Sequence, residues 1–179
     1  MKLNVGSGDP KGQYRTEEWV NIDLSADKVI NPKRNVLTMS VLSMPEEWAG
    51  KFDEVHCIHV LEHIDRNLRL QVFEAIYKVM AEGGKLFLEV PDFEGIIYRL
   101  YAAYEAGDLT EVHKWKTSIY GKQRYTGDSH HWGYDEVHLM ELAKQAKFQT
   151  CQTYTGTTPE RMISAHYKQE PVILLEAIK

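Results

Sequence analysis

The sequence is 179 residues long, with 43% hydrophobic and 26% charged residues. These values are typical of a globular protein, and the length predicts one domain spanning residues 1–179. The net charge is −5, and basic residues are interleaved with acidic ones, which argues against nucleic acid as a partner. No apolar run approaches the roughly 20 residues of a membrane span, and no signal-peptide core follows Met1. The sequence therefore predicts a cytoplasmic protein that does not associate with membranes.

Short apolar, β-branched segments alternate with longer helical patterns along the chain. This alternation is typical of an α/β domain built around a mostly parallel sheet. The expected strands cover residues 2–5, 19–24, 35–39, 54–60, 85–90, 148–154 and 172–178. Seven strands of this kind predict a full sheet.

Two helical patterns flank the later strands. The first opens on Asp65 as a capping residue, repeats apolar residues at every fourth position from Leu68, and ends at Gly83-Gly84. The second covers residues 135–147, with Asp135 as its cap and an apolar side that includes Val137 and Met140. Both patterns predict helices that pack on the sheet.

Residues 93–134 hold 9 of the 19 aromatic side chains. They include a helical piece with Ile97, Tyr101 and Tyr104 on one face, a second helix over 109–120, and the loop RYTGDSHHWGY. Because this block follows the fifth strand, we expect it over the carboxyl edge of the sheet, where open α/β sheets bind ligands. The sequence predicts a helical lid there, although the aromatics suit the core of a helical appendage equally well.

A glycine turn follows the first strand, and an acid ends the second. Gly6 and Gly8 let the backbone approach a ligand, and Asp23 can accept hydrogen bonds from two ribose hydroxyls. A dinucleotide fingerprint needs a third glycine at position 11, which is Lys11, and a helix starting at the turn. Residues 9–18 leave room for a short helix at most. This pattern favours S-adenosylmethionine, an adenosine ligand without phosphate.

The chain resembles the class I S-adenosylmethionine-dependent methyltransferases, in particular small members with a shortened first helix. The matching segments are LNVGSG (3–8), WVNIDLS (19–25), FDEVHCIHVLEHI (52–64), EGGKLFLEVPD (82–92) and WGYDEVHLMELAKQAKF (132–148). The resemblance implies a Rossmann-like α/β fold with strand order 3-2-1-4-5-7-6 and an antiparallel last strand.

The resemblance also implies a set of cofactor-binding residues. Those near the methionine part are Gly6, Ser7 and Gly8, Asp23 holds the ribose, and Ser40 and Val41 face the adenine. His59 is expected near the sulfonium, with Asn4, Leu24 and Leu61 bordering the cofactor. Two of these depart from the family pattern, because an acid is usual at the positions of Asn4 and Ser40. Each change replaces a charge-assisted hydrogen bond by a neutral one, a loss of about 1 kcal/mol or somewhat more.

Methyl transfer to oxygen or nitrogen usually needs a base, and histidine has a suitable pKa. The favoured candidates are His131 and His130, beside Trp132 in the expected lid, with His63 and Asp92 also within reach of the strand ends. A metal site made of these histidines and Asp128 is not expected, because adjacent residues of an extended loop point to opposite sides.

The sequence thus predicts a methyltransferase that acts on a small polar acceptor, as an O-methyltransferase of a saccharide or similar metabolite with a histidine base. One alternative is a non-catalytic module or partner subunit that binds S-adenosylmethionine or S-adenosylhomocysteine. A less favoured one is an NAD(P)-dependent oxidoreductase. The aromatic excess serves an interface as well as a pocket, so both a monomer and a homodimer remain open.

Overall fold

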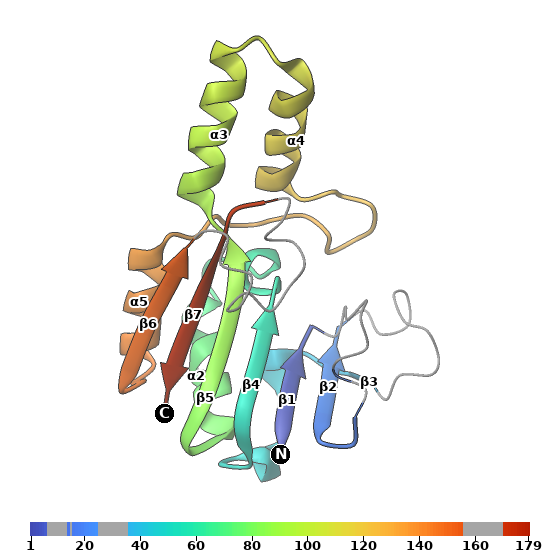
Figure 1. Ribbon diagram of the computed structural model, residues 1–179. Coiled ribbons are helices and arrows are strands. Elements are labelled where there is room, and N and C mark those ends of the chain that lie inside the picture. Colours follow the sequence, from blue (N-terminus) through green and yellow to red (C-terminus); the bar gives the residue numbers. More distant parts are fainter. Residues whose placement is uncertain (7–13, 15, 25–35, 156–169) are drawn as a thin grey trace.

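The protein is described from a computed structural model, which covers residues 1–6, 14, 16–24, 36–155 and 170–179. Seven strands form one sheet in the order β3-β2-β1-β4-β5-β7-β6, as Figure 1 shows. The strands are β1 (Lys2–Val5), β2 (Trp19–Asp23), β3 (Val36–Thr38), β4 (Phe52–Ile58), β5 (Met80–Pro91), β6 (Thr150–Thr155) and β7 (Val172–Ile178). β7 runs antiparallel to β5 and β6. The predicted fold and strand order are confirmed.

The elements between β4 and β6 differ in part from the sequence prediction. Helix α2 (Arg69–Val79) begins after Asp65, which was predicted to cap it. The Asp65 carboxylate instead accepts a hydrogen bond from the Asn67 backbone N–H at 2.8 Å, within a turn that precedes the helix. Gly83 and Gly84 do not end the helix, since they lie within β5. Helix α5 (Glu136–Gln145) is capped by Asp135, as predicted.

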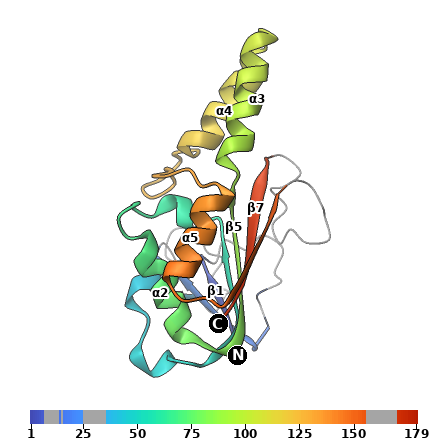
Figure 2. The same cartoon turned by 90° about the vertical axis from the view of Figure 1, so that its left-hand side faces the viewer.

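Both α2 and α5 cover the same face of the sheet, as Figure 2 shows. The main core lies between these helices and strands β1, β4, β5 and β7. On α5 the buried side chains are Leu139, Leu142 and Ala143, whereas Val137 is exposed. The predicted apolar side of this helix was therefore wrong at Val137.

Helices α3 (Phe93–Glu105) and α4 (Leu109–Tyr120) form a hairpin that extends beyond the carboxyl edge of the sheet (Figure 1). The bounds of α4 match the prediction. Ile96, Ala103, Val112 and Trp115 form a small core between the two helices. The face of α3 that carries Tyr101 is solvent-exposed, and so are the side chains of Ile97, Tyr98 and Tyr104. None of the helices described has the length and apolar character that crossing a bilayer requires.

One side chain of β4, His56, lies among aromatic rings. Its ring centroid is 4.7 Å from that of Trp19 and 5.2 Å from that of Phe87. Its Nδ1 lies 3.0 Å from the Tyr14 hydroxyl. Burial lowers the pKa of His56 to about 4, although the Glu54 carboxylate opposes this shift; the charge of Lys2 adds to it.

We expect His56 to make the stability depend on pH. The folded protein takes up this proton only near pH 4, whereas the unfolded chain does so near 6.5. Neutral His56 therefore adds its full contribution to the free energy of unfolding above pH 6.5. This contribution, up to about 3 kcal/mol, is lost as the pH falls from 6.5 to about 4. Urea unfolding across the window should give a shallower pH dependence for His56→Asn than for the unchanged protein. Equal slopes would contradict this role.

Candidate active site

The carboxyl ends of β1, β2, β4 and β5 meet at one edge of the sheet, because these strands are parallel. Most of the predicted site residues follow directly from these ends. Gly6 follows β1, and its N–H donates to the Ile22 carbonyl of β2 at 2.9 Å. Ser7 and Gly8, which were also predicted to bind cofactor, lie outside the described residues. Most of the expected short crossover, residues 9–18, lies outside them as well.

Gly6 has a backbone conformation that requires glycine. Its φ is +77°, and a Cβ at this position would overlap the Val60 side chain. Val60 follows β4, so the turn after β1 packs directly on the turn after β4. The backbone of Gly6 is thereby held at the edge where a ligand approaches.

Replacing Gly6 with alanine is expected to lower the free energy of unfolding by about 1–3 kcal/mol, since the change adds both backbone strain and overlap. A second substitution, Val60→Ala, removes the overlap and leaves the strained φ. The double variant should therefore regain part of the loss, which urea denaturation of the four proteins measures. Additive effects of the two substitutions would show that the contact with Val60 is unimportant.

The end of β2 presents an acidic side chain beside an apolar one. Asp23 is the last residue of the strand, and its carbonyl accepts the Met39 N–H at 3.1 Å. Leu24 follows it and is exposed. Burial first, and then the negative charges that include Asp128 and Asp23, raise the pKa of Tyr125. The loop after α4, which carries Tyr125, therefore reaches toward the end of β2.

Other predicted cofactor residues already have structural partners. The side-chain amide of Asn4 is buried and donates to Asn21 Oδ1 at 3.0 Å. Ser40 Oγ accepts the Leu42 N–H at 3.1 Å and caps the 3₁₀ turn η1 (Val41–Ser43). Val41 and Leu61 are buried in the main core, so any contact with a ligand would come from the edge of these side chains.

His59, immediately after β4, lies between two buried acids. Its Nδ1 is 3.1 Å from Glu62 Oε1, and its Nε2 is 3.3 Å from Glu89 Oε1. Burial alone would lower the pKa of His59, but hydrogen bonds to these carboxylates outweigh it and raise the pKa to about 10. His59 also has a positive φ of 52°. The imidazolium is thus fixed at the strand end by its acidic neighbours.

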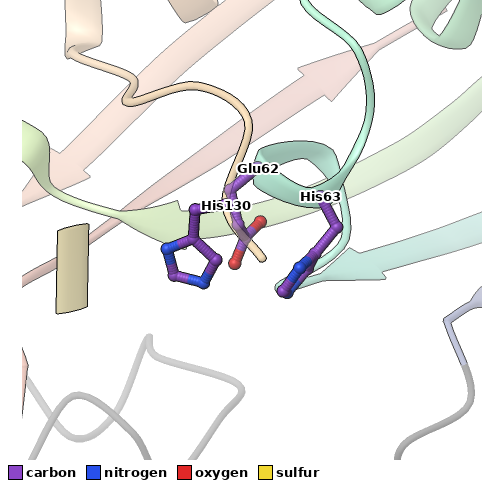
Figure 3. Close-up of side chains that lie close together, drawn as sticks. All are labelled: Glu62, His63 and His130. Atoms are coloured by element: carbon purple, nitrogen blue, oxygen red, sulfur yellow. The ribbon is translucent and has the colours of Figure 1, made fainter. Parts of the chain in front are cut away.

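Glu62 also faces two further histidines, as Figure 3 shows. Glu62 and His63 belong to the 3₁₀ turn η3 (Leu61–His63), and His130 lies in the loop after α4. One possible ligand atom from each of the three lies within 4.8 Å of those of the other two. We call Glu62, His63 and His130 the acceptor cluster.

Hydrogen bonds fix the tautomers of both histidines in the acceptor cluster. His63 Nδ1 is 3.1 Å from the Ser129 carbonyl, and His130 Nδ1 is 2.9 Å from the Ser118 carbonyl. A carbonyl oxygen only accepts, so each Nδ1 carries the proton. In the neutral form of either ring, the Nε2 atom therefore carries the lone pair. Burial lowers the pKa of His130, and this favours its neutral form.

The third member of the cluster is a carboxylate with one free oxygen. Glu62 is only 2% exposed, and its Oε2 has no hydrogen-bond partner among the described residues. Burial alone would raise the pKa of Glu62, but the hydrogen bond and charge of His59, together with His63 and His130, lower it. The cluster is therefore rich in acceptors, with an ionised acid beside two imidazole lone pairs.

The remaining predicted catalytic residues, Asp92 and His131, and Asp128, which was considered only as a metal ligand, are placed differently. The Asp92 carboxylate caps α3 by accepting the Gly95 N–H at 3.1 Å. Asp128 is held by Arg124, whose Nε lies 2.9 Å from Asp128 Oδ2. His131 is exposed, and its backbone N–H donates to the Glu62 carbonyl at 2.7 Å. His131 thus lies next to the acceptor cluster in the chain, whereas Asp92 and Asp128 have local structural roles.

Sequence reasoning missed Glu62 as a site residue. Glu62 lies with Leu61 and His63 in the 3₁₀ turn between β4 and α2. The available signal was an acid next to a histidine just after a buried strand, where parallel strands present functional groups.

Comparisons with known proteins identify the family and the fold. A family model described as a methyltransferase domain matches residues 10–153. A SAM-dependent methyltransferase of Archaeoglobus fulgidus superposes with a TM-score of 0.64 at 15% identity, covering 99% of this chain and 85% of that one. No curated protein matches the sequence.

Two further solved structures have the same fold. A SAM-dependent methyltransferase of Thermotoga maritima gives a TM-score of 0.63 at 16% identity, covering 99% of this chain and 82% of that one. The 1,6-didemethyltoxoflavin-N1-methyltransferase of Burkholderia thailandensis, with S-adenosylhomocysteine bound, gives 0.59 at 11% identity, with 99% and 70% covered. Identities this low show the fold alone.

Proposed function

The chain belongs to the S-adenosylmethionine-dependent methyltransferases, and we propose that it methylates an oxygen atom of a small polar acceptor, such as a saccharide. The methyltransferase family fixes the cofactor and the reaction class. The choice of oxygen and of a hydroxyl-rich acceptor rests on one observation. The acceptor cluster offers two imidazole lone pairs and a carboxylate oxygen without a hydrogen-bond partner among the described residues, and these groups can accept the protons that hydroxyl groups donate.

The residues at the strand ends fit the cofactor. When bound, S-adenosylmethionine would supply an electrophilic methyl group for the acceptor oxygen, with S-adenosylhomocysteine as the leaving group. Gly6 keeps the turn after β1 packed on Val60, where a Cβ would overlap, and its lack of a side chain lets a ligand approach the backbone at this strand end. Asp23 ends β2 in the position where a carboxylate can accept both ribose hydroxyls.

A histidine takes the proton that the acceptor hydroxyl loses. His63 and His130 each hold the Nδ1 proton on a backbone carbonyl, so their Nε2 atoms can accept another. His131 is the third candidate, one residue beyond His130 and exposed. Glu62 would stabilise the positive charge that forms on any of these rings, since its carboxylate is buried and ionised.

We also propose that residues 93–134 act as a lid over this edge within a domain formed by residues 1–179. Methyl transfer needs positioning and exclusion of water more than it needs acid or base chemistry. The hairpin of α3 and α4 leads into the loop with His130, which supports this role. The tyrosines of α3 are exposed, and we expect them not to contact the methyl group that is transferred.

The proposal is tested by incubating the purified protein with S-adenosylmethionine and a panel of polyols, saccharides and amines. We expect S-adenosylhomocysteine to form with hydroxyl acceptors, and proton NMR of the product to show an O-methyl group. A product with an N-methyl group would overturn the oxygen assignment. Cofactor binding without turnover on any acceptor would favour a non-catalytic binding module.

A further inference from the structure

We propose that Glu62, His63 and His130 bind a divalent cation of the zinc type. The sequence alone predicts no metal site, because adjacent histidines such as His130 and His131 point to opposite sides of an extended loop. In the structure Asp128 is bound by Arg124, and Glu62 is the acid that lies beside His63 and His130. Two imidazoles and one carboxylate are a ligand set typical of zinc and of first-row metals with an open coordination position.

The first argument is that three electron-pair donors, Glu62, His63 and His130, converge, and that no hydrogen-bond donor among the described residues pairs with Glu62 Oε2. One ligand atom from each of the three lies within 4.8 Å of the other two. Glu62 Oε2 is buried and has no hydrogen-bond partner among the residues that the structure describes. An unpaired buried carboxylate oxygen is costly. A cation at the centre of the three would compensate it and use both imidazole lone pairs.

The second argument concerns the atoms behind the ligands. In metal sites, the nitrogen of a histidine that does not bind metal usually donates to a carbonyl or carboxylate, which fixes the ring. His63 donates from Nδ1 to Ser129, and His130 donates from Nδ1 to Ser118. The other Glu62 oxygen, Oε1, lies 3.1 Å from His59 Nδ1. All three potential ligands are therefore oriented by outer partners.

The separation of the groups requires a small adjustment. Ligands of a tetrahedral zinc ion are about 2.0–2.2 Å from the metal and therefore roughly 3.4 Å from one another. The ligand atoms lie within 4.8 Å of one another, so reaching this value needs a shift of about an ångström, shared by three side chains. Since His63 and His130 lie on different segments, the loop after α4 can supply part of it.

The cation would have a defined role in the proposed reaction. Coordination lowers the pKa of a bound hydroxyl, so His63 and His130 would act as ligands and not as bases. The proton would pass to His131, the remaining candidate beside the cluster, or to water. This role rests on the proposed function, whereas metal binding itself rests on the geometry of Glu62, His63 and His130.

The test is titration of tag-free, EDTA-treated protein with Co²⁺ and then Zn²⁺. We expect one Co²⁺ per chain with visible absorption bands of a nitrogen- and oxygen-bound ion, displaced by Zn²⁺. His63→Ala and His130→Ala should each weaken Zn²⁺ binding by at least about 100-fold, and Glu62→Gln should do the same. Because Glu62 is buried, the two histidine variants keep the test valid if Glu62→Gln does not fold. His113→Ala, an exposed histidine of α4, is the matched control.

The outcomes separate the two proposals. Absence of saturable binding, or equal binding by the histidine variants, would overturn the metal site. If such a metal-free protein still methylates a hydroxyl acceptor, the proposed function stands and His63 or His130 remains a candidate base. Tight binding by these three residues in a protein that methylates only amines would support the site and overturn the oxygen assignment.

Discussion

Replacing His130 with alanine is expected to lower kcat by about 10²–10⁴-fold, the range seen when a group that activates the reacting atom is removed. The same loss is expected whether the imidazole accepts a proton or binds a cation, since both roles use its Nε2. The Kd for S-adenosylmethionine should change little, because His130 is not among the predicted cofactor-binding residues, which lie at the ends of β1, β2, β3 and β4. Formation of S-adenosylhomocysteine gives kcat, and calorimetry gives Kd.

His63→Ala should have an effect of similar size, and the double variant should be little worse than either single one. Groups that work as a unit show such non-additive losses. His113→Ala is the control, since this histidine is exposed on α4 and should leave kcat unchanged. An unaltered kcat in both folded variants, His130→Ala and His63→Ala, would remove the acceptor cluster from the mechanism.

Replacing Asp23 with alanine is expected to raise the Kd for S-adenosylmethionine by about 10- to 100-fold. A carboxylate that accepts hydrogen bonds from two hydroxyls contributes about 1.5–3 kcal/mol. Asp23 is at the end of β2 and partly exposed, so its removal should cost little stability. Calorimetric titration measures the change in Kd, and thermal unfolding without ligand checks the fold.

The matched control for Asp23→Ala is Asp53→Ala. Asp53 lies near the start of β4, where it pairs with the N-terminal amine at 2.6 Å, at the opposite edge of the sheet. We expect this variant to bind the cofactor normally. The Kd of Asp23→Asn for S-adenosylmethionine should lie between those of Asp23→Ala and Asp53→Ala, because an amide keeps one acceptor oxygen and loses the charge. Normal cofactor affinity in Asp23→Ala would show that the ribose is held elsewhere.

The sequence predicted those features that depend on local patterns. The short apolar runs gave the strands in the correct order once the family resemblance was recognised, and Asp135 capped its helix as expected. Asp23 ends its strand because β2 pairs with β3 only as far as Thr38. The strand positions and the helix cap follow from hydrophobic periodicity and capping chemistry, which are visible along the chain, whereas the strand order came from the family resemblance.

The acceptor cluster could not be predicted in the same way. His63 and His130 are 67 positions apart, and they come together because the loop after α4 returns to the end of β4. Glu62 reads as a turn residue unless the tight 3₁₀ turn and its burial are known. Asp65 failed as a cap because the turn after His63 uses its carboxylate locally. Such features depend on tertiary contacts.

The helical hairpin determines where one of the two imidazoles stands. The backbone N–H of His130 is bonded to Tyr120 and its ring to Ser118, both in the last turn of α4, whereas Glu62 and His63 ride on the end of β4. Any tilting of the hairpin against the sheet therefore changes the spacing inside the cluster. A molecule that binds the exposed tyrosines of α3 and tilts the hairpin would thus change the distances among the reacting side chains without contacting them.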